Sequence, residues 1–172
     1  MSFDEFRTGS TEPWTVDILC ALVRAQKPYV IVETGTFEGR TTARLVEAMM
    51  SYLHEHEARL FTVESDPERV KAAWDRILPP GSVNFTIMQG DAIAFLSQCE
   101  PPDFVFLDDD HTEAHVREEI RLVLKILRPG GIVCVHDVIG PFGLGGVVKE
   151  YGGVVLDLPR LHAAGGLGII AK

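Results

Sequence analysis

Short apolar runs alternate with amphipathic helical stretches along most of the chain. Short apolar runs bounded by turns are typical of buried strands, whereas apolar positions spaced three and four apart are typical of helices. The alternation predicts right-handed crossovers and a doubly wound, seven-stranded, mainly parallel sheet with helices on both faces. The predicted strands lie near residues 29–33, 59–64, 83–88, 103–108, 131–137, 153–158 and 166–171. The predicted helices lie near residues 11–26, 39–56, 66–78, 91–98, 112–127 and 143–151.

The connection between the last two predicted strands is short. Only residues 159–165 separate them, which is too few for the helical crossover that joins parallel strands. The final strand is therefore expected to run antiparallel, as the second arm of a hairpin at one end of the sheet.

Several of the predicted strands end on a carboxylate. These residues are Glu33, Glu64, Asp108 and Asp137. In an open parallel sheet, ligands bind outside the carboxyl ends of the strands, so the four acids should line one rim. That rim is where we expect the functional site.

The first predicted strand runs into the turn Thr34-Gly35-Thr36-Phe37-Glu38-Gly39 and then into a helical pattern. Gly35 lets the backbone turn and approach a ligand, and Gly39 lets the helix start close to the sheet. The N-terminus of that helix offers free N–H groups. A dinucleotide fingerprint, G-x-G-x-x-G, needs a second glycine where Phe37 stands, so a pyrophosphate would be crowded here.

The spacing Glu33-x-Gly35-x-x-x-Gly39 resembles the first motif of the class I S-adenosylmethionine (SAM)-dependent methyltransferases. The segments 60–64 and 88–92 resemble that family's next two motifs, and the resemblance extends to the end of the chain. It implies an α/β, Rossmann-like fold with SAM as cofactor. In the family, the acid at position 64 accepts hydrogen bonds from both ribose hydroxyls. The cofactor-binding residues implied in this way are Glu33, Gly35, Thr36, Gly39, Glu64, Ser65, Asp91, Ala92 and Asp108.

Within this class, the chain looks most like the catechol O-methyltransferase-like group and the small methyltransferases grouped with cephalosporin hydroxylase. The segments that carry this likeness are 103–111, D-F-V-F-L-D-D-D-H, and 127–138, L-R-P-G-G-I-V-C-V-H-D-V. Where catechol-type enzymes have an asparagine ligand, this chain has Val138. The resemblance implies O-methylation of a small-molecule acceptor, with Asp108 and Asp137 in the positions that bind metal.

Three consecutive acids, residues 108–110, follow the fourth predicted strand and repel one another unless positive charge compensates them. One compensator is a hard divalent cation such as Mg²⁺, held by Asp108 and Asp137. The other is the sulfonium and the substrate themselves, with His111 or His136 as a base near neutral pH. The candidate catalytic residues are therefore Asp108, His111 and Asp137, and both routes stay open.

The 172 residues and the hydrophobic content of 46% fit a single domain over residues 1–172. In that domain, an N-terminal helical segment at 1–28 precedes a cofactor-binding core at 29–172. The net charge of −9 and the scattered basic residues disfavour a nucleic-acid partner. The acidic start of the chain is unlike a secretory signal and no apolar run reaches membrane-spanning length, so we expect a cytoplasmic protein with no membrane partner.

Catechol-type relatives cover the pocket with extra N-terminal helices or insertions, and this chain has few residues to spare for such a roof. The candidates are residues 1–13, the glycine-rich loop 139–146 or another subunit. We therefore expect either a homodimer that completes the pocket or an open site. His115 is interpreted as a surface or helix residue without a role in the site.

Three other functions remain open. A nicotinamide-dependent oxidoreductase would share the sheet and the acid after the second strand, but this chain has Phe37 in place of the second glycine of the dinucleotide fingerprint. A metal-dependent hydrolase or hydroxylase-like enzyme could use the Asp–His cluster, formed by residues 108–111 with His136 and Asp137, without a methyl donor. A non-catalytic SAM-binding module would bind the cofactor while Asp108 and His111 were dispensable.

Overall fold

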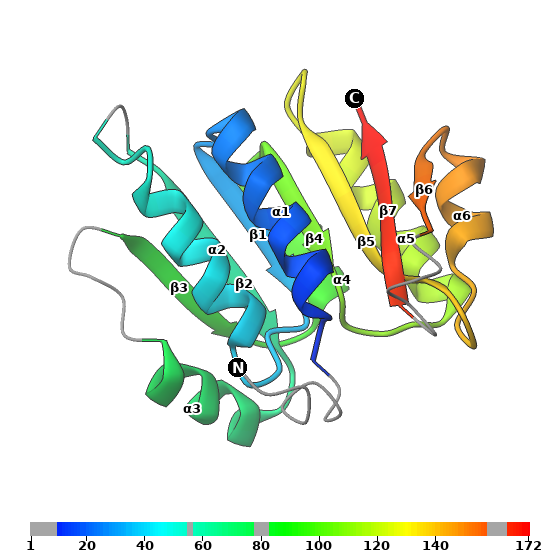
Figure 1. Cartoon of the computed structure of the whole chain (residues 1–172). Helices are drawn as coiled ribbons and strands as arrows, with labels where there is room; N and C mark the ends of the chain where they lie inside the picture. Colours follow the sequence, from blue (N-terminus) through cyan, green and yellow to red (C-terminus); the bar gives the residue numbers. More distant parts are fainter. Residues whose placement is uncertain (1–9, 55–56, 78–82, 158–164) are drawn as a thin grey trace.

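The computed structural model describes residues 10–54, 57–77, 83–157 and 165–172, which form one sheet covered by helices on both faces (Figure 1). The strands, in the order in which they lie in the sheet, are β3 Asn84–Gln89, β2 Arg59–Glu64, β1 Val30–Thr34, β4 Phe104–Leu107, β5 Ile132–Ile139, β7 Gly165–Ala171 and β6 Val154–Leu156. The helices are α1 Pro13–Gln26, α2 Arg40–Met50, α3 Pro67–Arg76, α4 Ala92–Leu96, α5 Glu113–Ile126 and α6 Gly145–Glu150.

The strand directions confirm the predicted sheet. Strands β3, β2, β1, β4 and β5 pair in parallel, and β7 runs antiparallel to both β5 and β6. The chain first builds outward from β1 to β3 and then returns to build from β4 on the other side of β1. This reversal between β1 and β4 is the switch point at which open α/β sheets bind ligands.

Helices α1, α2 and α3 pack on one face of the sheet, and α4, α5 and α6 pack on the other. Successive side chains of a strand point to opposite faces. In β4, Phe104 and Phe106 join the first layer, whereas Val105 and Leu107 join the second, and all four are buried. The strands next to the switch point are therefore buried on both faces, which fixes the position of the rim residues at their ends.

Local signals set most of the element boundaries, with one clear difference from expectation. Asp66 caps α3, because its side chain accepts the N–H of Glu68 at 2.9 Å and Pro67 occupies the first turn. Helix α2 is shorter than the predicted 39–56 and ends at Met50. There the Ser51 hydroxyl donates to the Ala48 carbonyl at 2.7 Å, a local bond that competes with continuation of the helix.

Candidate active site

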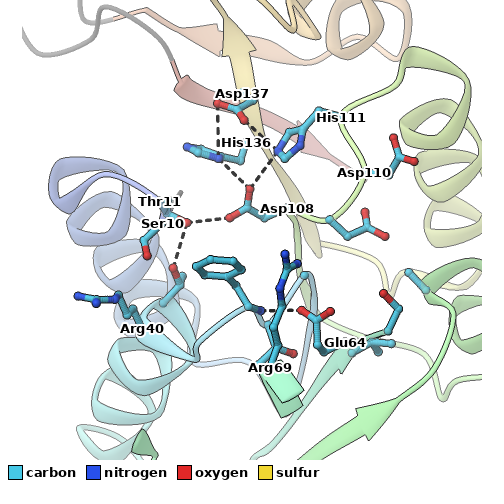
Figure 2. Close-up of a pocket in the computed structure, with 18 of the residues that line it drawn as sticks. Ser10, Thr11, Arg40, Glu64, Arg69, Asp108, Asp110, His111, His136 and Asp137 are labelled. Carbon is cyan, nitrogen blue, oxygen red and sulfur yellow. Dashed lines mark hydrogen bonds and ion pairs between the residues drawn. The ribbon is translucent and has the colours of Figure 1, made fainter. Parts of the chain in front are cut away.

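A cavity of about 670 Å³ opens at the carboxyl ends of the strands, on the rim predicted from the sequence. Its walls come from the turn after β1, the ends of β2 and β3, the segment after β4, the end of β5 and residues 10–12 (Figure 2). Cavities of roughly 300–1,000 Å³ are typical of small-molecule and cofactor sites. The predicted cofactor residues that line it are Gly35, Thr36, Glu64, Ser65, Asp91, Ala92 and Asp108.

Glu33 is a predicted cofactor residue that does not line the cavity. Its side chain is fully buried and accepts hydrogen bonds from the hydroxyls of Thr42 at 2.5 Å and Thr62 at 2.7 Å. The Thr62 hydroxyl also lies 2.6 Å from that of Thr36, which does line the cavity. Glu33 is therefore connected to the cavity wall only indirectly, through the hydroxyl groups of Thr62 and Thr36.

The burial of Glu33 makes fold stability depend on pH. Burial first, and then the charge of Asp108, raise the pKa of Glu33 to about 7 despite the two hydroxyl donors. Because the folded-state pKa is above that of the unfolded chain, the folded protein binds an extra proton between about pH 4.5 and pH 7. The contribution of this proton to stability is complete below that window and is lost as the pH rises through it.

Replacing Glu33 with glutamine, which mimics the neutral carboxyl, should remove this pH dependence. We expect Glu33→Gln to gain up to about 3 kcal/mol of unfolding free energy over the wild type at pH 8, with the difference shrinking toward pH 5. Urea unfolding followed by circular dichroism at both pH values measures it. Glu47→Gln, an exposed change on α2, is the control and should leave the wild-type pH profile unaltered. Equal slopes for Glu33→Gln and the wild type would show that Glu33 stays ionised.

The two glycines of the turn serve packing. Gly35 has φ +81°, and a Cβ there would lie 2.1 Å from the backbone oxygen of Asp108. The absent side chain thus lets the end of β4 pack directly against the turn after β1. Gly39, the other predicted cofactor residue that does not line the cavity, has φ +73°, and its Cβ would lie 2.7 Å from the Ile77 side chain. Gly39 therefore lies between the start of α2 and the end of α3.

Glu64 forms one wall of the cavity and is almost completely buried. Its Oε2 accepts the N–H of Phe37 at 2.8 Å, and its Oε1 accepts the N–H of Asp66 at 3.0 Å. The first bond ties β2 to the turn after β1, and the second holds the segment between β2 and α3. A carboxylate has about four acceptor positions, so two remain for hydroxyl groups of a ligand in the cavity.

Four side chains gather at the other end of the cavity, as Figure 2 shows: Asp108, His111, His136 and Asp137. His136 Nδ1 lies 2.8 Å from Asp108 Oδ1, and His111 Nε2 lies 2.9 Å from Asp137 Oδ2. One ligand atom from each residue fits within 4.8 Å of the others. The structure thus brings together the three predicted catalytic residues and adds His136 to them.

Both ring nitrogens of His136 face carboxylates, because Nε2 lies 2.9 Å from Glu12 Oε2. A neutral imidazole has a single N–H, so this arrangement favours the doubly protonated ring. Burial alone would lower the pKa of His136, but the charge and hydrogen bond of Asp108, with Glu12, raise it to about 11. His136 is therefore a fixed cation that offsets part of the acidic charge.

The carboxylates around His111 also favour its protonated form. Its hydrogen bonds to Asp108 and then Asp137 raise its pKa to about 9, although burial opposes them. Burial would raise the pKa of Asp108, but His136 and His111 outweigh it and lower that pKa. The imidazoliums are a source of compensating charge that the sequence pattern does not reveal. His111 must lose a proton before it can serve as a base.

The N-terminal segment contributes to the site across a large separation in sequence. The Thr11 hydroxyl donates to Asp108 Oδ2 at 2.8 Å, the Thr41 hydroxyl donates to Thr11 at 3.0 Å, and Glu12 bonds His136 as described. Of the three candidates for a roof, residues 10–12 therefore supply part of it; residues 1–9 lie outside the described residues. In the loop 139–146, the Phe142 ring lies 4.7 Å from that of His111. A partner subunit stays a prediction.

Other residues that line the cavity lie outside the motifs from which the site was predicted. Arg40 and Arg69 bring positive charge to a rim that is otherwise acidic, and the Arg69 guanidinium lies 4.7 Å from the centre of the Phe37 ring. His115 lies on helix α5, as its assignment to a helix predicted, and it also lines the cavity with a side chain only 20% exposed. Among the described residues, no helix is long and apolar enough to cross a bilayer.

Comparison with known proteins agrees with this geometry. A family model described as a methyltransferase domain matches residues 32–138. A Bacillus cereus O-methyltransferase solved in complex with S-adenosylhomocysteine (SAH) has 19% identity and a TM-score of 0.72, covering 98% of this chain and 86% of that chain. TomG, a Streptomyces achromogenes O-methyltransferase involved in tomaymycin synthesis and solved with SAM, has 20% identity and a TM-score of 0.72, covering 98% and 84%.

A third similar structure is the precorrin-6y C5,15-methyltransferase of Geobacter metallireducens. It has 18% identity and a TM-score of 0.75, covering 100% of this chain and 97% of that chain. At such identities the likeness to solved structures establishes the fold alone. No curated protein matches the sequence significantly.

Proposed function

Since this chain belongs to the methyltransferase-domain family, as a class I SAM-dependent enzyme, we propose that it methylates a hydroxyl group of a small-molecule acceptor. The observation that carries the proposal is the division of one cavity into two chemically different ends. Glu64 and the turn after β1 form one end, and the Asp–His cluster forms the other. A donor and an acceptor can therefore lie in one cavity with their reacting atoms in its middle.

The first end suits the adenosine part of SAM. Glu64 is buried, lines the cavity and keeps two acceptor positions after bonding the N–H groups of Phe37 and Asp66. Asp91 caps α4 through the N–H of Ala94 at 2.7 Å and also lines the cavity, as a residue near the adenine would. When bound, SAM supplies an electrophilic methyl group. The chain's part is to hold acceptor and donor in line, which replaces a bimolecular encounter with a positioned one.

The second end suits activation of a hydroxyl. Asp108 and Asp137 offer carboxylate oxygens and His111 a ring nitrogen, a donor set that fits a divalent cation. When bound, such an ion would lower the pKa of a hydroxyl placed beside it. His136 and Thr11 donate to the two oxygens of Asp108 and hold that carboxylate in a fixed orientation. Without an ion, deprotonated His111 is the residue placed to accept the hydroxyl proton.

Charge and shape support a small acceptor. The net charge of −9 disfavours a polyanion, and the cavity volume is that of a small-molecule site. The similar Bacillus cereus and Streptomyces achromogenes proteins are both O-methyltransferases, which favours oxygen as the atom methylated.

The test is a screen for methylated products by mass spectrometry. Purified protein would be incubated with SAM and a panel of phenols, catechols, hydroxy acids, amines and thiols, with Mg²⁺, with Mn²⁺ and with a chelator. Methyl transfer to hydroxyl compounds supports the proposal, and its loss in chelator assigns the metal route. Transfer only to amines or thiols would overturn the O-methylation proposal. NAD binding without SAM binding would revive the oxidoreductase alternative.

A further inference from the structure

A second group of metal-ligating side chains lies beside the first and has no part in the proposed reaction. Asp109 comes from the segment after β4, and His115 and Glu119 lie one turn apart on α5. His115 Nε2 is 3.0 Å from Asp109 Oδ2 and 3.9 Å from Glu119 Oε2. One ligand atom from each residue lies within 4.8 Å of the others.

Glu119 is the unusual member of this group. Its side chain is 0% exposed, and among the described residues neither of its carboxylate oxygens has a partner with full hydrogen-bond geometry, although the side chains of Thr34 and Asp109 lie close enough to influence its pKa. It lies on the buried face of α5, next to Val116, Ile120 and Val123. Buried carboxylates are almost always paired or bound to a metal, because an isolated buried charge is strongly destabilising. Asp109 Oδ1 is also buried without a hydrogen-bond partner among the described residues.

We infer that Asp109, His115 and Glu119 bind a divalent transition-metal ion, with Zn²⁺ and Mn²⁺ as the best-suited ions. One imidazole and two carboxylates are a mixed nitrogen and oxygen donor set of the kind these ions use. Bonds of about 2.0–2.2 Å to a common ion place two ligand atoms roughly 3–4 Å apart. The distances from His115 Nε2 to Asp109 Oδ2 and to Glu119 Oε2, 3.0 Å and 3.9 Å, lie in this range. The ion would supply the positive charge that Glu119 lacks.

Three protein ligands leave at least one coordination position open. Asp109 and His115 line the cavity whereas Glu119 lies behind them, so the open position faces the cavity. Water, or an oxygen of a bound small molecule, would occupy it. The ion would also tie the segment after β4 to the first turns of α5. This inference does not depend on which acceptor the enzyme methylates.

A proton is the competing occupant. Burial, followed by the charge of Asp109, raises the pKa of Glu119 well above its usual range, so the metal-free protein holds a neutral carboxyl there. A metal ion would displace that proton on binding. The two occupants predict opposite responses to added metal, which an experiment can separate.

The experiment measures metal binding by chelator-treated protein. Zn²⁺ and Mn²⁺ would be titrated by calorimetry, with the bound ion counted by mass spectrometry and the melting temperature recorded. We expect Glu119→Gln to bind one equivalent fewer than the wild type. The affinity at this site should fall at least about 100-fold, since even outer partners of metal ligands typically account for 10–100-fold. Glu118→Gln, the exposed neighbour on α5, should bind like the wild type.

Two further variants separate this site from its neighbour and from misfolding. Asp137→Asn alters the Asp108–His111–His136–Asp137 group and should leave the ion at Glu119 in place. His115→Ala changes a partly exposed side chain and should lose the same equivalent as Glu119→Gln without disturbing the core. Equal metal content and equal metal-induced stabilisation in the wild type, Glu119→Gln and His115→Ala would overturn the proposal. So would a wild type that gains no stability from either ion.

Discussion

Replacing Glu64 with alanine should abolish calorimetrically measurable binding of SAH, with a loss of roughly 10²–10⁴-fold in affinity. The two acceptor positions that Glu64 keeps free face the cavity, and hydrogen bonds to a charged acceptor each contribute about 1.5–3 kcal/mol. Loss of two such bonds corresponds to the stated change at about 1.4 kcal/mol per factor of ten. Isothermal calorimetry with SAH, SAM and NAD measures the effect.

The substitution also removes the bonds that hold the N–H groups of Phe37 and Asp66, so the shape of the turn must be checked separately. Glu64→Gln retains one acceptor oxygen and should bind SAH with intermediate affinity. Glu68→Gln, an exposed change in the first turn of α3, should bind like the wild type. If a folded Glu64→Ala protein bound SAH within threefold of the wild type, the adenosine would have to lie elsewhere in the cavity.

Replacing Asp108 with asparagine should lower kcat for methyl transfer by roughly 10³-fold. Proton transfer by a positioned side chain typically contributes 10²–10⁴-fold, and Asp108 is the residue on which both hydroxyl-activation routes converge. It bonds His136, His111 and Thr11, so the amide would weaken the whole cluster while keeping the side-chain shape. Initial rates with the acceptor found in the screen, at saturating SAM, measure the effect.

Measuring kcat and the KM for SAM separately shows whether Asp108 acts on the acceptor or in cofactor binding. A role at the acceptor end lowers kcat and leaves the KM for SAM within about tenfold. Asp75→Asn, an exposed change on α3, controls for the loss of one acid and should retain wild-type rates. A variant that kept more than a tenth of the wild-type kcat would exclude Asp108 from both routes.

The sheet could be predicted from the sequence because its signals are local and repeated. Each strand next to the switch point is a buried apolar run, and the short 159–165 connection leaves a hairpin as the only route to β7. The acids on the rim were predicted for the same reason. Glu64, Asp108 and Asp137 directly follow or end such runs, and the geometry of a parallel sheet carries them to one edge.

Two predicted cofactor residues, Glu33 and Gly39, do not line the cavity, because a motif does not specify depth. Glu33 is one residue before the end of β1 and points into the threonine layer, and Gly39 meets Ile77 of a helix that the motif does not include. Glu12 was missed because its contact with His136 spans 124 residues and leaves no local trace. Glu119 did leave a signal, since an acid at a core position of an amphipathic helix breaks the apolar stripe.

The two ends of the described chain differ as points of attachment. Thr11 and Glu12 bond the Asp–His cluster, so the described chain begins beside the cavity. Strand β7 runs antiparallel and delivers Lys172 to the amino edge of the sheet, where its backbone N–H bonds the Gly131 carbonyl (Figure 1). Biosensor immobilisation, affinity tags and fluorescent fusions therefore belong after Lys172, where they leave the cavity open to solution.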